Sequence, residues 1–323
     1  MVEDLFKIQI IKSSLLTIKI LNMKSNFKNI LPAAMVLMAV GLLGTGCTKA
    51  DYSDDFTKGD APPVAGGFTN SSEVAPASLV AHFPFDNNIS DAKNGVTGGV
   101  ASGATSFSTG IKGQAYQGSS TGFIGYATPG PIATLTSFTI SMWINTSRHD
   151  GGAQGLFMLA KQDGSFWGNF FMMIEGQNPA NAENMFMKLH FEKNNALFVE
   201  HWMEPNGDFR AADMYDAWRH IAWTYDAATS KVSWFINGQK KALPPGSDER
   251  KADGNGTPLG ALNFKDATKF VIGGFMGNLG APFNSAEPWM LKYTGKLDEF
   301  RIYNKALTET EISAIQVLER QGR

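Results

Sequence analysis

The segment Trp218–Gln239, WRHIAWTYDAATSKVSWFINGQ, decides the fold of this chain. It contains two runs of β-branched and aromatic residues, Arg219–Tyr225 and Lys231–Ile236, separated by a polar turn. Such runs predict β-strands, and the dipeptide Asn237-Gly238 that follows favours a tight turn. The first run has bulky residues at both odd and even positions. We therefore expect a strand that is buried on both faces, at the centre of one sheet of a sandwich.

The same strand pattern explains His220, Trp143 and Trp234 as structural residues, with no catalytic or ligand-binding role. His220 lies in the strand that we expect to be buried on both faces, so we interpret it as a structural histidine. Trp143 and Trp234 lie within alternating strand segments, where a large apolar ring is more often core than ligand platform. We expect none of the three to contact a ligand.

Strand signals recur along the chain from residue 78 onwards, separated by turns rich in glycine. Glycine is frequent, with 34 residues, and aromatic residues make up 11% of the chain. Many short strands with almost no helix predict an all-β, two-sheet antiparallel sandwich of the jelly-roll kind. The further expected strands are Leu79–Phe85, Ser137–Thr146, Gly155–Lys161, Asn169–Glu175, Met185–Glu192, Ala196–Met203, Lys269–Phe275 and Gly295–Asn304.

One short helix is expected near the C-terminus, in LTETEISAIQVLER. Thr308 and Glu311 have the spacing of a capping box, in which each side chain bonds the backbone N–H of the other. Ile312, Ile315 and Leu318 form an apolar stripe at helical spacing. We expect this helix to pack on the edge of the sandwich.

Five ordered segments give the domain a specific resemblance to the laminin G-like or concanavalin A-like jelly rolls. Trp218–Gln239 and YTGKLDEFRIYNKALTETEI from Tyr293 are similar to the two hallmark blocks of that family. LVAHFPFDNN, GIKGQAYQG (Gly110–Gly118) and SFTISMWINT match its other landmarks in order. The resemblance implies a carbohydrate- or protein-binding module, since only a minority of relatives are glycoside hydrolases.

The N-terminal part of the chain has the features of a lipoprotein. An apolar run ends at Cys47, the single cysteine, and resembles the bacterial lipoprotein signal, in which that cysteine carries lipid. A transmembrane anchor is the alternative. We expect residues 1–46 to be a misannotated extension plus the signal, with Met23 as the true start, residues 47–77 to be a flexible tether, and residues 78–323 to be the jelly roll.

The resemblance also implies a location for the domain. Three acidic residues follow Cys47 closely: Asp51, Asp54 and Asp55. They resemble the acidic patch that follows the lipid-bearing cysteine in surface-exported lipoproteins of the Bacteroidetes type. We therefore expect a lipid anchor in the outer membrane and a domain that faces the cell exterior. A merely solvated linker is the alternative interpretation of the same residues.

Composition and motifs exclude several function classes. The formal net charge is −2 and the basic residues do not cluster, so nothing indicates a nucleic-acid partner. Glycosidases need two carboxylates that flank the scissile bond. The catalytic strand of laminarinase-like jelly-roll hydrolases carries them in a Glu-x-Asp-x-Glu or Glu-x-Asp-x-x-Glu run, and the sequence has neither. Zinc, phosphate-loop and serine-elbow motifs are also absent from the sequence. We expect a protein that is not an enzyme.

Tryptophans in predicted loops are the candidate ligand platforms, because a sugar ring presents an apolar face and a rim of hydroxyl groups. Each has polar neighbours that could bond hydroxyl groups. Packing over the core beneath the loop is the alternative role for each ring. The candidates are Trp167 with Asn169, Trp202 with Glu200 and Arg210, and Trp289 with Asn278.

Calcium is implied by the resemblance alone. Many jelly-roll relatives hold one structural Ca²⁺ between their first and last strands, and the matching positions are Asp86, Asn88 and Asp298. Local turn-forming hydrogen bonds of Asp86 and Asp298 are the alternative.

These features lead to two hypotheses about function, from different classes, and to a third, weaker one. The first is a cell-surface lipoprotein that binds a polysaccharide or oligosaccharide, as an accessory to an outer-membrane glycan-uptake complex. The second is a structural or protein-interaction subunit of an outer-membrane assembly. The third is a divergent glycoside hydrolase whose carboxylates are distant in the sequence.

Overall fold

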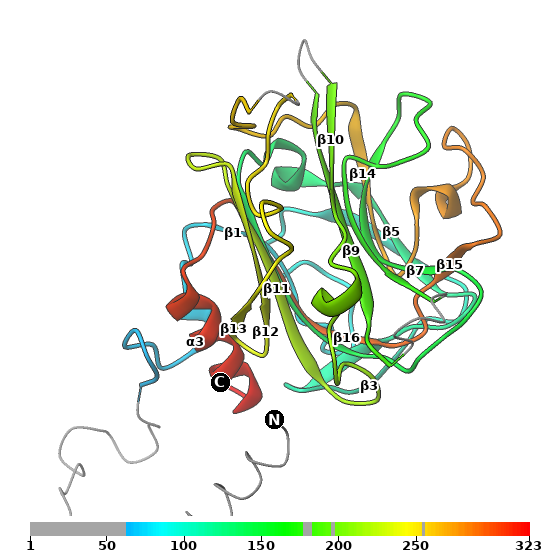
Figure 1. Ribbon diagram of the computed structural model, residues 1–323. Helices are drawn as coiled ribbons and strands as arrows, with labels where there is room; N and C mark the ends of the chain where they lie inside the picture. The colour runs from blue at the N-terminus through cyan, green and yellow to red at the C-terminus, as the bar shows by residue number, and fades with distance from the viewer. Residues whose placement is uncertain (1–62, 177–182, 195–197, 254–255) are drawn as a thin grey trace, which may run out of the picture. The chain divides into compact units, whose positions relative to one another are not determined.

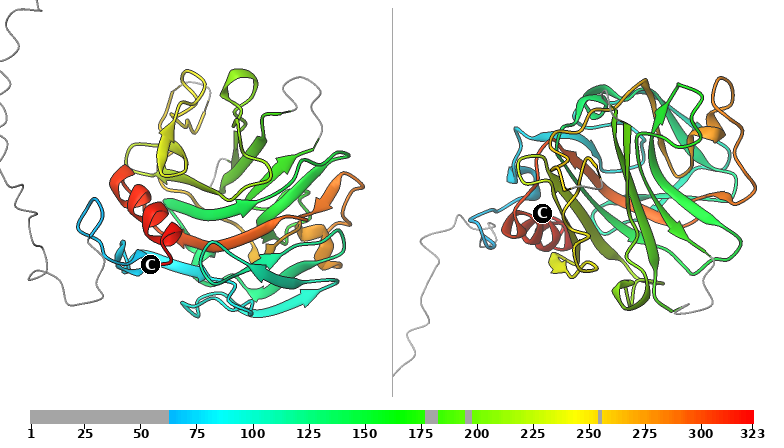
Figure 2. Two further views of the ribbon diagram at one scale, coloured as in Figure 1. Left: turned by 90° about the horizontal axis from the view of Figure 1, so that it is seen from below. Right: turned by 45° about the horizontal axis from the view of Figure 1, so that its top comes forward.

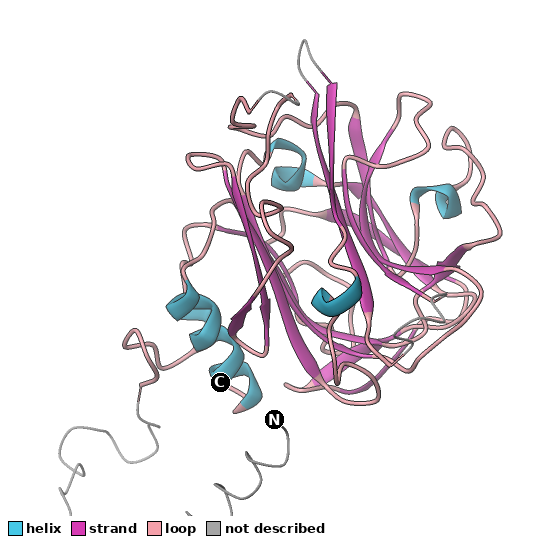
Figure 3. Cartoon of the chain, viewed as in Figure 1, coloured by secondary structure: helices cyan, strands magenta, loops and turns pink. Residues whose placement is uncertain are grey.

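The computed structural model describes residues 63–176, 183–194, 198–253 and 256–323. In this part of the chain two eight-stranded sheets pack face to face (Figure 1, Figure 3). Sheet A contains β1 (Leu79–Phe83), β3 (Ser106–Thr109), β4 (Gln114–Gln117), β6 (Phe138–Asn145), β11 (Arg219–Asp226), β12 (Lys231–Ile236), β13 (Gln239–Lys241) and β16 (Lys296–Tyr303). Sheet B contains β2 (Thr97–Ser102), β5 (Phe123–Thr128), β7 (Ala153–Lys161), β8 (Phe170–Glu175), β9 (Phe186–Asn194), β10 (Phe198–Met203), β14 (Ala267–Ile272) and β15 (Met290–Lys292).

The strand order is that of a jelly roll, with many neighbours that are distant in the sequence. Sheet A runs β13-β12-β11-β6-β16-β4-β3, with β1 beside β16, and sheet B runs β10-β9-β8-β7-β14-β5-β2. Apart from the parallel pairing of β15 with β7, the strand pairs are antiparallel. The two-sheet antiparallel sandwich is therefore confirmed. The position of β11 between β12 and β6 also agrees with the expected central strand.

Aromatic rings from the facing sheets form the core between them. Phe138 of sheet A lies 4.7 Å from Phe170 of sheet B, centroid to centroid, and Phe157 of sheet B lies 5.2 Å from Phe300 of sheet A. Such ring contacts bury large apolar surfaces and dominate the stability of a domain of this size.

Six strands were not anticipated from the sequence. Of these, β2 shows why, since its sequence TGGVAS is almost wholly exposed and has neither alternation nor bulky core residues. Its ladder with β5 holds it in place instead. Short edge strands of this kind carry little local signal, because their pairing depends on a partner distant in the sequence. The others are β3, β4, β5, β13 and β15.

The C-terminal helix α3 (Glu309–Arg320) forms at the expected residues but packs on a different part of the sandwich from the one expected. Thr308 and Glu311 make the predicted capping box, with Glu311 N donating to Thr308 Oγ1 at 3.2 Å. The apolar stripe packs on the outer face of sheet A, against Ala222, Phe235 and Tyr303 (Figure 2). Our expectation that the helix covers an edge is thus wrong. The small side chain of Ala222 leaves room for a helix over the centre of the sheet.

The residues that we interpreted as structural are buried. His220 is fully buried, with Nε2 2.8 Å from Ser141 Oγ, and burial lowers its pKa to about 3. Trp143 lies beneath α3, and Trp234 stacks on Trp223 in the core with centroids 5.2 Å apart. None of them offers an open face to a ligand.

The folded unit begins before residue 78, where we had placed the end of the tether. The short helix η2 (Ser71–Glu73) lies against α3, and Ser71 Oγ donates to the carbonyl of Arg323 at 2.9 Å. Val74 is buried in the same cluster as Leu318. Cys47 and the predicted signal lie outside the described residues. Of the described helices, none is long and apolar enough to cross a membrane.

Candidate functional site

Three tryptophans from separate parts of the chain meet on the outer face of sheet B. Trp167 follows β7, Trp202 lies in β10, and Trp289 immediately precedes β15. The ring centroid of Trp167 lies 5.2 Å from that of Trp202 and 5.5 Å from that of Trp289. All three rings are partly exposed. We call Trp167, Trp202, Trp289 and the neighbouring Phe166 the aromatic face.

Strand alternation and two loops place these rings together. In β10 the side chains of His201 and Met203 point to the core, so Trp202 points outward. The turn that carries Trp167 contacts the loop before Trp289, since Asn284 Nδ2 donates to the carbonyls of Gly164 and Ser165 at 3.2 and 3.3 Å. The two loops lie on the right of Figure 1, in green and orange.

A second aromatic layer supports the exposed one. Phe171 of β8 stacks under Trp167, with centroids 5.2 Å apart and planes inclined by 16°. His190 of β9 stacks on Phe171 at 4.6 Å and meets the edge of Trp202 at 4.5 Å. Phe275 packs against Trp289 at 6.0 Å. The exposed rings are therefore fixed before any ligand arrives.

The aromatic face also has polar groups available for a ligand. Within the described part of the chain, the indole N–H groups of Trp167, Trp202 and Trp289 make no hydrogen bond. They are not among the buried unsatisfied atoms either. An indole combines an apolar ring with one such donor, a combination that suits contact with a sugar.

Charged residues lie on both sides of Trp202. Glu200 lies in β10 two residues before Trp202, on the same face as its ring, since alternate residues of a strand share a face. Glu204 lies two residues after Trp202, just beyond the end of β10. Across the β9–β10 ladder, Glu200 lies opposite Glu192 and Trp202 lies opposite His190. Lys188 bonds Glu204 at 3.2 Å and Glu175 at 3.0 Å.

A buried ion pair lies under one of these flanks. Lys161 Nζ donates to both carboxylate oxygens of Glu192, at 2.9 and 2.8 Å, and Asn194 Nδ2 donates to Oε2 at 2.7 Å. His190 Nε2 lies 3.4 Å from the same carboxylate, and burial lowers the pKa of His190. The ring is accordingly neutral near pH 7 and packs as an aromatic.

His190, Glu192 and Glu200 could together hold a metal ion, since each has a potential ligand atom within 4.8 Å of the others. Imidazole with carboxylates would suit a transition metal better than calcium. However, Lys161 places its positive charge on Glu192, where it competes with an added cation. We propose no metal at this group.

Sequence reasoning missed Phe166, His190, Glu192 and Lys161. Phe166 is 36% exposed and lies 4.8 Å from Trp167. The sequence did contain a signal for His190 and Glu192. In LHFE these two polar residues alternate with the core residues Leu189 and Phe191, which is typical of a strand with one outward face. No such signal exists for Lys161, whose partner is 31 positions away.

Two predicted asparagines have contacts inside the protein. Asn169 is buried, donates from Nδ2 to the carbonyl of Lys265 at 2.8 Å and accepts from its backbone N–H at 2.9 Å. Asn278 lies in η5 (Met276–Leu279), where its side-chain oxygen accepts from Phe275 N at 2.9 Å. Both hold loops beside the aromatic face.

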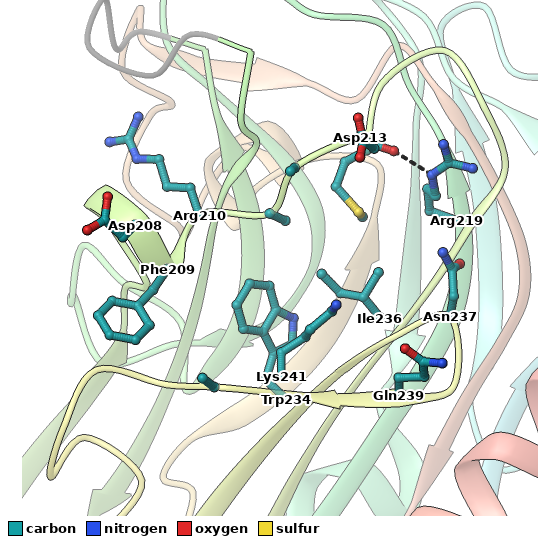
Figure 4. Close-up of a pocket in the computed structure, with 14 residues that line it drawn as sticks. Asp208, Phe209, Arg210, Asp213, Arg219, Trp234, Ile236, Asn237, Gln239 and Lys241 are labelled. Atoms are coloured by element: carbon teal, nitrogen blue, oxygen red, sulfur yellow. Dashed lines mark hydrogen bonds between the residues drawn. The ribbon is translucent and has the colours of Figure 1, made fainter. Parts of the chain in front are cut away.

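Arg210 lies elsewhere, in a separate cavity of about 590 Å³ (Figure 4). That cavity lies between the segment that follows η4 (Gly207–Phe209) and the β12–β13 hairpin. Trp234 and Ile236 line it beside Arg219 and Lys241. Trp234 is only 3% exposed, so its ring closes the cavity floor and offers little surface for stacking.

The predicted calcium residues are already used as hydrogen-bond partners. Asp298 accepts from the backbone N–H groups of Ile111 (2.7 Å), Lys112 (3.1 Å) and Glu299 (2.8 Å), and burial raises its pKa to about 7. Asp86 Oδ1 accepts from Gln114 N at 2.8 Å.

Asn88 is used in the same way, with its side-chain oxygen accepting from Ser90 N at 2.9 Å. Calcium takes six to eight oxygen ligands. With these contacts, Asp86, Asn88 and Asp298 do not fit such a site. They fit the alternative role as turn-forming residues.

Comparison with known proteins agrees with this architecture. Residues 120–313 match the family described as the concanavalin A-like lectin/glucanases superfamily, which is more than half of the chain. This chain belongs to that superfamily. The predicted resemblance of the domain to laminin G-like or concanavalin A-like jelly rolls is thereby confirmed. No curated protein matches its sequence.

Solved structures of the same fold are remote in sequence. One is domain 4 of AbnA, a GH43 extracellular arabinanase from Geobacillus stearothermophilus, in complex with arabinotriose. It is 19% identical to this chain, with a TM-score of 0.49, and the match covers 74% of this chain and 98% of that chain. A structure of botulinum neurotoxin type C, whose cell entry is described as dependent upon interaction with two ganglioside molecules, is 13% identical, with a TM-score of 0.51. The match covers 75% of this chain and 51% of that chain.

The receptor binding domain of the botulinum neurotoxin C/D mosaic serotype is 14% identical, with a TM-score of 0.50, and covers 75% of this chain and 51% of that chain. The concanavalin A-like domain thus spans about half the length of these neurotoxin chains. At such low identity the likeness shows the fold alone.

Proposed function

We propose that this protein is a non-catalytic carbohydrate-binding protein that holds a polysaccharide on the aromatic face of sheet B. The observation that carries the proposal is the meeting of Trp167, Trp202 and Trp289, partly exposed and with their indole N–H groups unbonded within the described residues. The rings would receive the apolar faces of sugar units. Glu200 and Glu204 lie where they can accept hydrogen bonds from hydroxyl groups.

A non-catalytic role is supported by the environment of Glu192. Glycosidases need two carboxylates that flank the scissile bond, one of them able to donate a proton. Glu192 and Glu200 face each other across two strands, yet Glu192 is 0% exposed and both its oxygens accept hydrogen bonds from Lys161. A buried, ion-paired carboxylate can neither contact a sugar nor protonate a leaving group.

We further propose that lipid on Cys47 anchors the protein in the outer membrane, with the domain facing the exterior as an accessory to glycan capture and uptake. The apolar run before Cys47 and the acidic, Pro- and Gly-rich stretch after it support this. Labelling of expressing cells with palmitate tests the anchor, since Cys47→Ala should lose the label. Unchanged labelling of that variant would contradict the proposal.

Affinity electrophoresis tests the binding function. The chain lacking residues 1–46 is run through native gels cast with plant, algal, fungal and host polysaccharides. We expect retardation by at least one glycan, weakened about 10- to 100-fold in Trp167→Ala and Trp289→Ala, as for buried aromatic anchors of other sites. Trp167→Phe, which keeps a ring over Phe171, should retain part of the affinity.

A matched control uses the separate cavity. Lys241→Ala changes a residue that lines the cavity with Trp234, distant from the aromatic face, and should not alter retardation. Loss of binding in Lys241→Ala with full binding in Trp167→Ala would instead move the site to that cavity.

Two other results would favour the alternatives. Uniform mobility across the panel, together with a partner protein that co-purifies from membranes, would support the interaction subunit. Release of reducing sugar, lost in Glu200→Gln, would support the hydrolase.

A further inference from the structure

We propose that the aromatic face selects uncharged polysaccharides and discriminates against chains that carry carboxylate or sulfate groups. This inference rests on the proposed function and names the ligand class of that same site. It follows from the sign of the charges around the tryptophans and from the way in which the positive charges are used.

Carboxylates lie on both sides of Trp202. Glu200 and Glu204 are exposed; Glu200 lies on the same face of β10 as the indole, and Glu204, just beyond the strand end, pairs with Lys188 of β9. Glu192 lies opposite Glu200 across the ladder, and Glu175 shares Lys188 with Glu204. A sugar unit stacked on Trp202 therefore has carboxylate oxygens at both of its edges.

Three neighbouring ammonium groups, those of Lys161, Lys188 and Lys265, each contact a carboxylate. Lys161 is 3% exposed and bonds both oxygens of Glu192, with Asp163 a further 3.8 Å contact. Lys188 is shared between two glutamates. Lys265, near the Trp167 loop, lies 3.8 Å from the carboxylate of Asp266. An anionic ligand would have to break one of these pairs to gain a counter-charge from any of the three.

The consequence differs between hydroxyl and acidic ligands. Hydroxyl groups donate hydrogen bonds to ionised carboxylates, and such charge-assisted bonds are stronger than neutral ones. A uronate or sulfate group at the same position brings like charges together, which disfavours binding. Carboxylates beside the rings thus strengthen the binding of neutral sugars and weaken the binding of acidic ones.

The test compares pairs of polymers that share a backbone. Neutral glucans, galactans, xylans and mannans are each titrated against the lipid-free chain, residues 47–323, by calorimetry, beside the lightly carboxymethylated form of each. For the neutral polymer that binds, we expect its carboxymethylated form to bind about tenfold more weakly at low salt, because of like-charge contacts. The gap should narrow at high salt, since salt screens exposed charges.

Charge-neutral variants separate repulsion from steric exclusion. Glu200→Gln with Glu204→Gln keeps the side-chain shape and should bring the two polymers within about threefold of each other, since each rim charge contributes modestly. The control is Asp208→Asn, at the separate cavity, which should leave the gap unchanged.

The possible failures are distinguishable. Equal binding of both polymers at low salt, or an unchanged gap in the double glutamine variant, overturns the selectivity while the binding function stands. Binding of no glycan at all overturns the proposed function, and this inference falls with it.

Discussion

The indole Nε1 of Trp143 donates a hydrogen bond to Glu319 Oε2 at 2.8 Å, and so joins the centre of sheet A to the last turn of α3. The second oxygen of Glu319 accepts from Arg301 Nε at 2.7 Å, and Arg301 in turn bonds Glu299 at 2.5 Å. His82 Nε2 lies 2.9 Å from the same Glu299 carboxylate. This buried chain of contacts holds the helix on the sheet.

Removal of Glu319 should therefore destabilise the fold severely. Glu319→Ala leaves Arg301 with Glu299 as its remaining carboxylate partner and leaves the Trp143 N–H without its acceptor. Breaking a buried pair of this kind costs about 3–5 kcal/mol in the free energy of unfolding. Glu319→Gln keeps an acceptor for Trp143 and should cost less. Urea denaturation measures both, with the exposed helix residue Thr310→Ala as a control that should change stability by no more than about 0.5 kcal/mol. A similar effect of all three variants would contradict this role.

Gly113 should resist substitution because of its neighbour. Its φ is +68°, and a Cβ there would lie 2.1 Å from Asp86 Oδ1. Gly246 has a similar φ of +75° with nothing within 4 Å of its Cβ position. Both alanine variants carry the backbone cost of about 1–2 kcal/mol. Gly113→Ala should lose about 1–3 kcal/mol more from the clash, and equal thermal shifts would show that Asp86 simply moves aside.

His220 should contribute stability that is lost in acid. Burial and the charge of Arg301 lower its folded pKa to about 3, from an ordinary value of 6.5. Below pH 6.5 the unfolded chain binds a proton that the folded chain does not, so stability falls toward pH 3 by up to about 1.4 kcal/mol per pH unit. The difference in unfolding free energy between the wild type and His220→Gln should shrink from pH 7 to pH 4.5. A constant difference would contradict the buried neutral state.

Calcium should have little effect on stability. Asp298 accepts three backbone N–H groups, and Asn88 accepts one, so their oxygens are occupied within the protein. We expect the same unfolding midpoint in EDTA and in millimolar CaCl₂. A midpoint that rises with the calcium concentration would show that the folded state binds the ion, and Asp86→Asn would then locate it.

The aromatic face should bind single soluble chains. The planes of Trp167 and Trp202 are inclined by 81°, and those of Trp167 and Trp289 by 54°. Rings at such angles cannot all lie flat on a crystalline polysaccharide surface. A short oligosaccharide of the retained glycan should therefore compete fully with the polymer in calorimetric displacement. Adsorption to an insoluble crystalline glycan that no oligosaccharide displaces would contradict the geometry.

Local patterns in the sequence determined ten of the sixteen described strands, the central place of β11 and the start of α3. Alternation, β-branched residues and the Thr308–Glu311 spacing act over a few residues, so they can be recognised without the fold. Three candidate platforms were also visible, since Trp167 and Trp289 stand among loop signals and Trp202 stands near the end of the expected strand Ala196–Met203. The structure corrects the loop placement of Trp202, which lies in β10.

Only the tertiary structure decided which of these residues form one site. It brought the three tryptophans together and placed Arg210 at another cavity. The register of β9 with β10 placed Glu192 opposite Glu200, and the small side chain of Ala222 admitted α3 to the outer face of sheet A. Such contacts join residues far apart in the chain. They depend on strand order and register, which packing of the whole sandwich sets and no local pattern encodes.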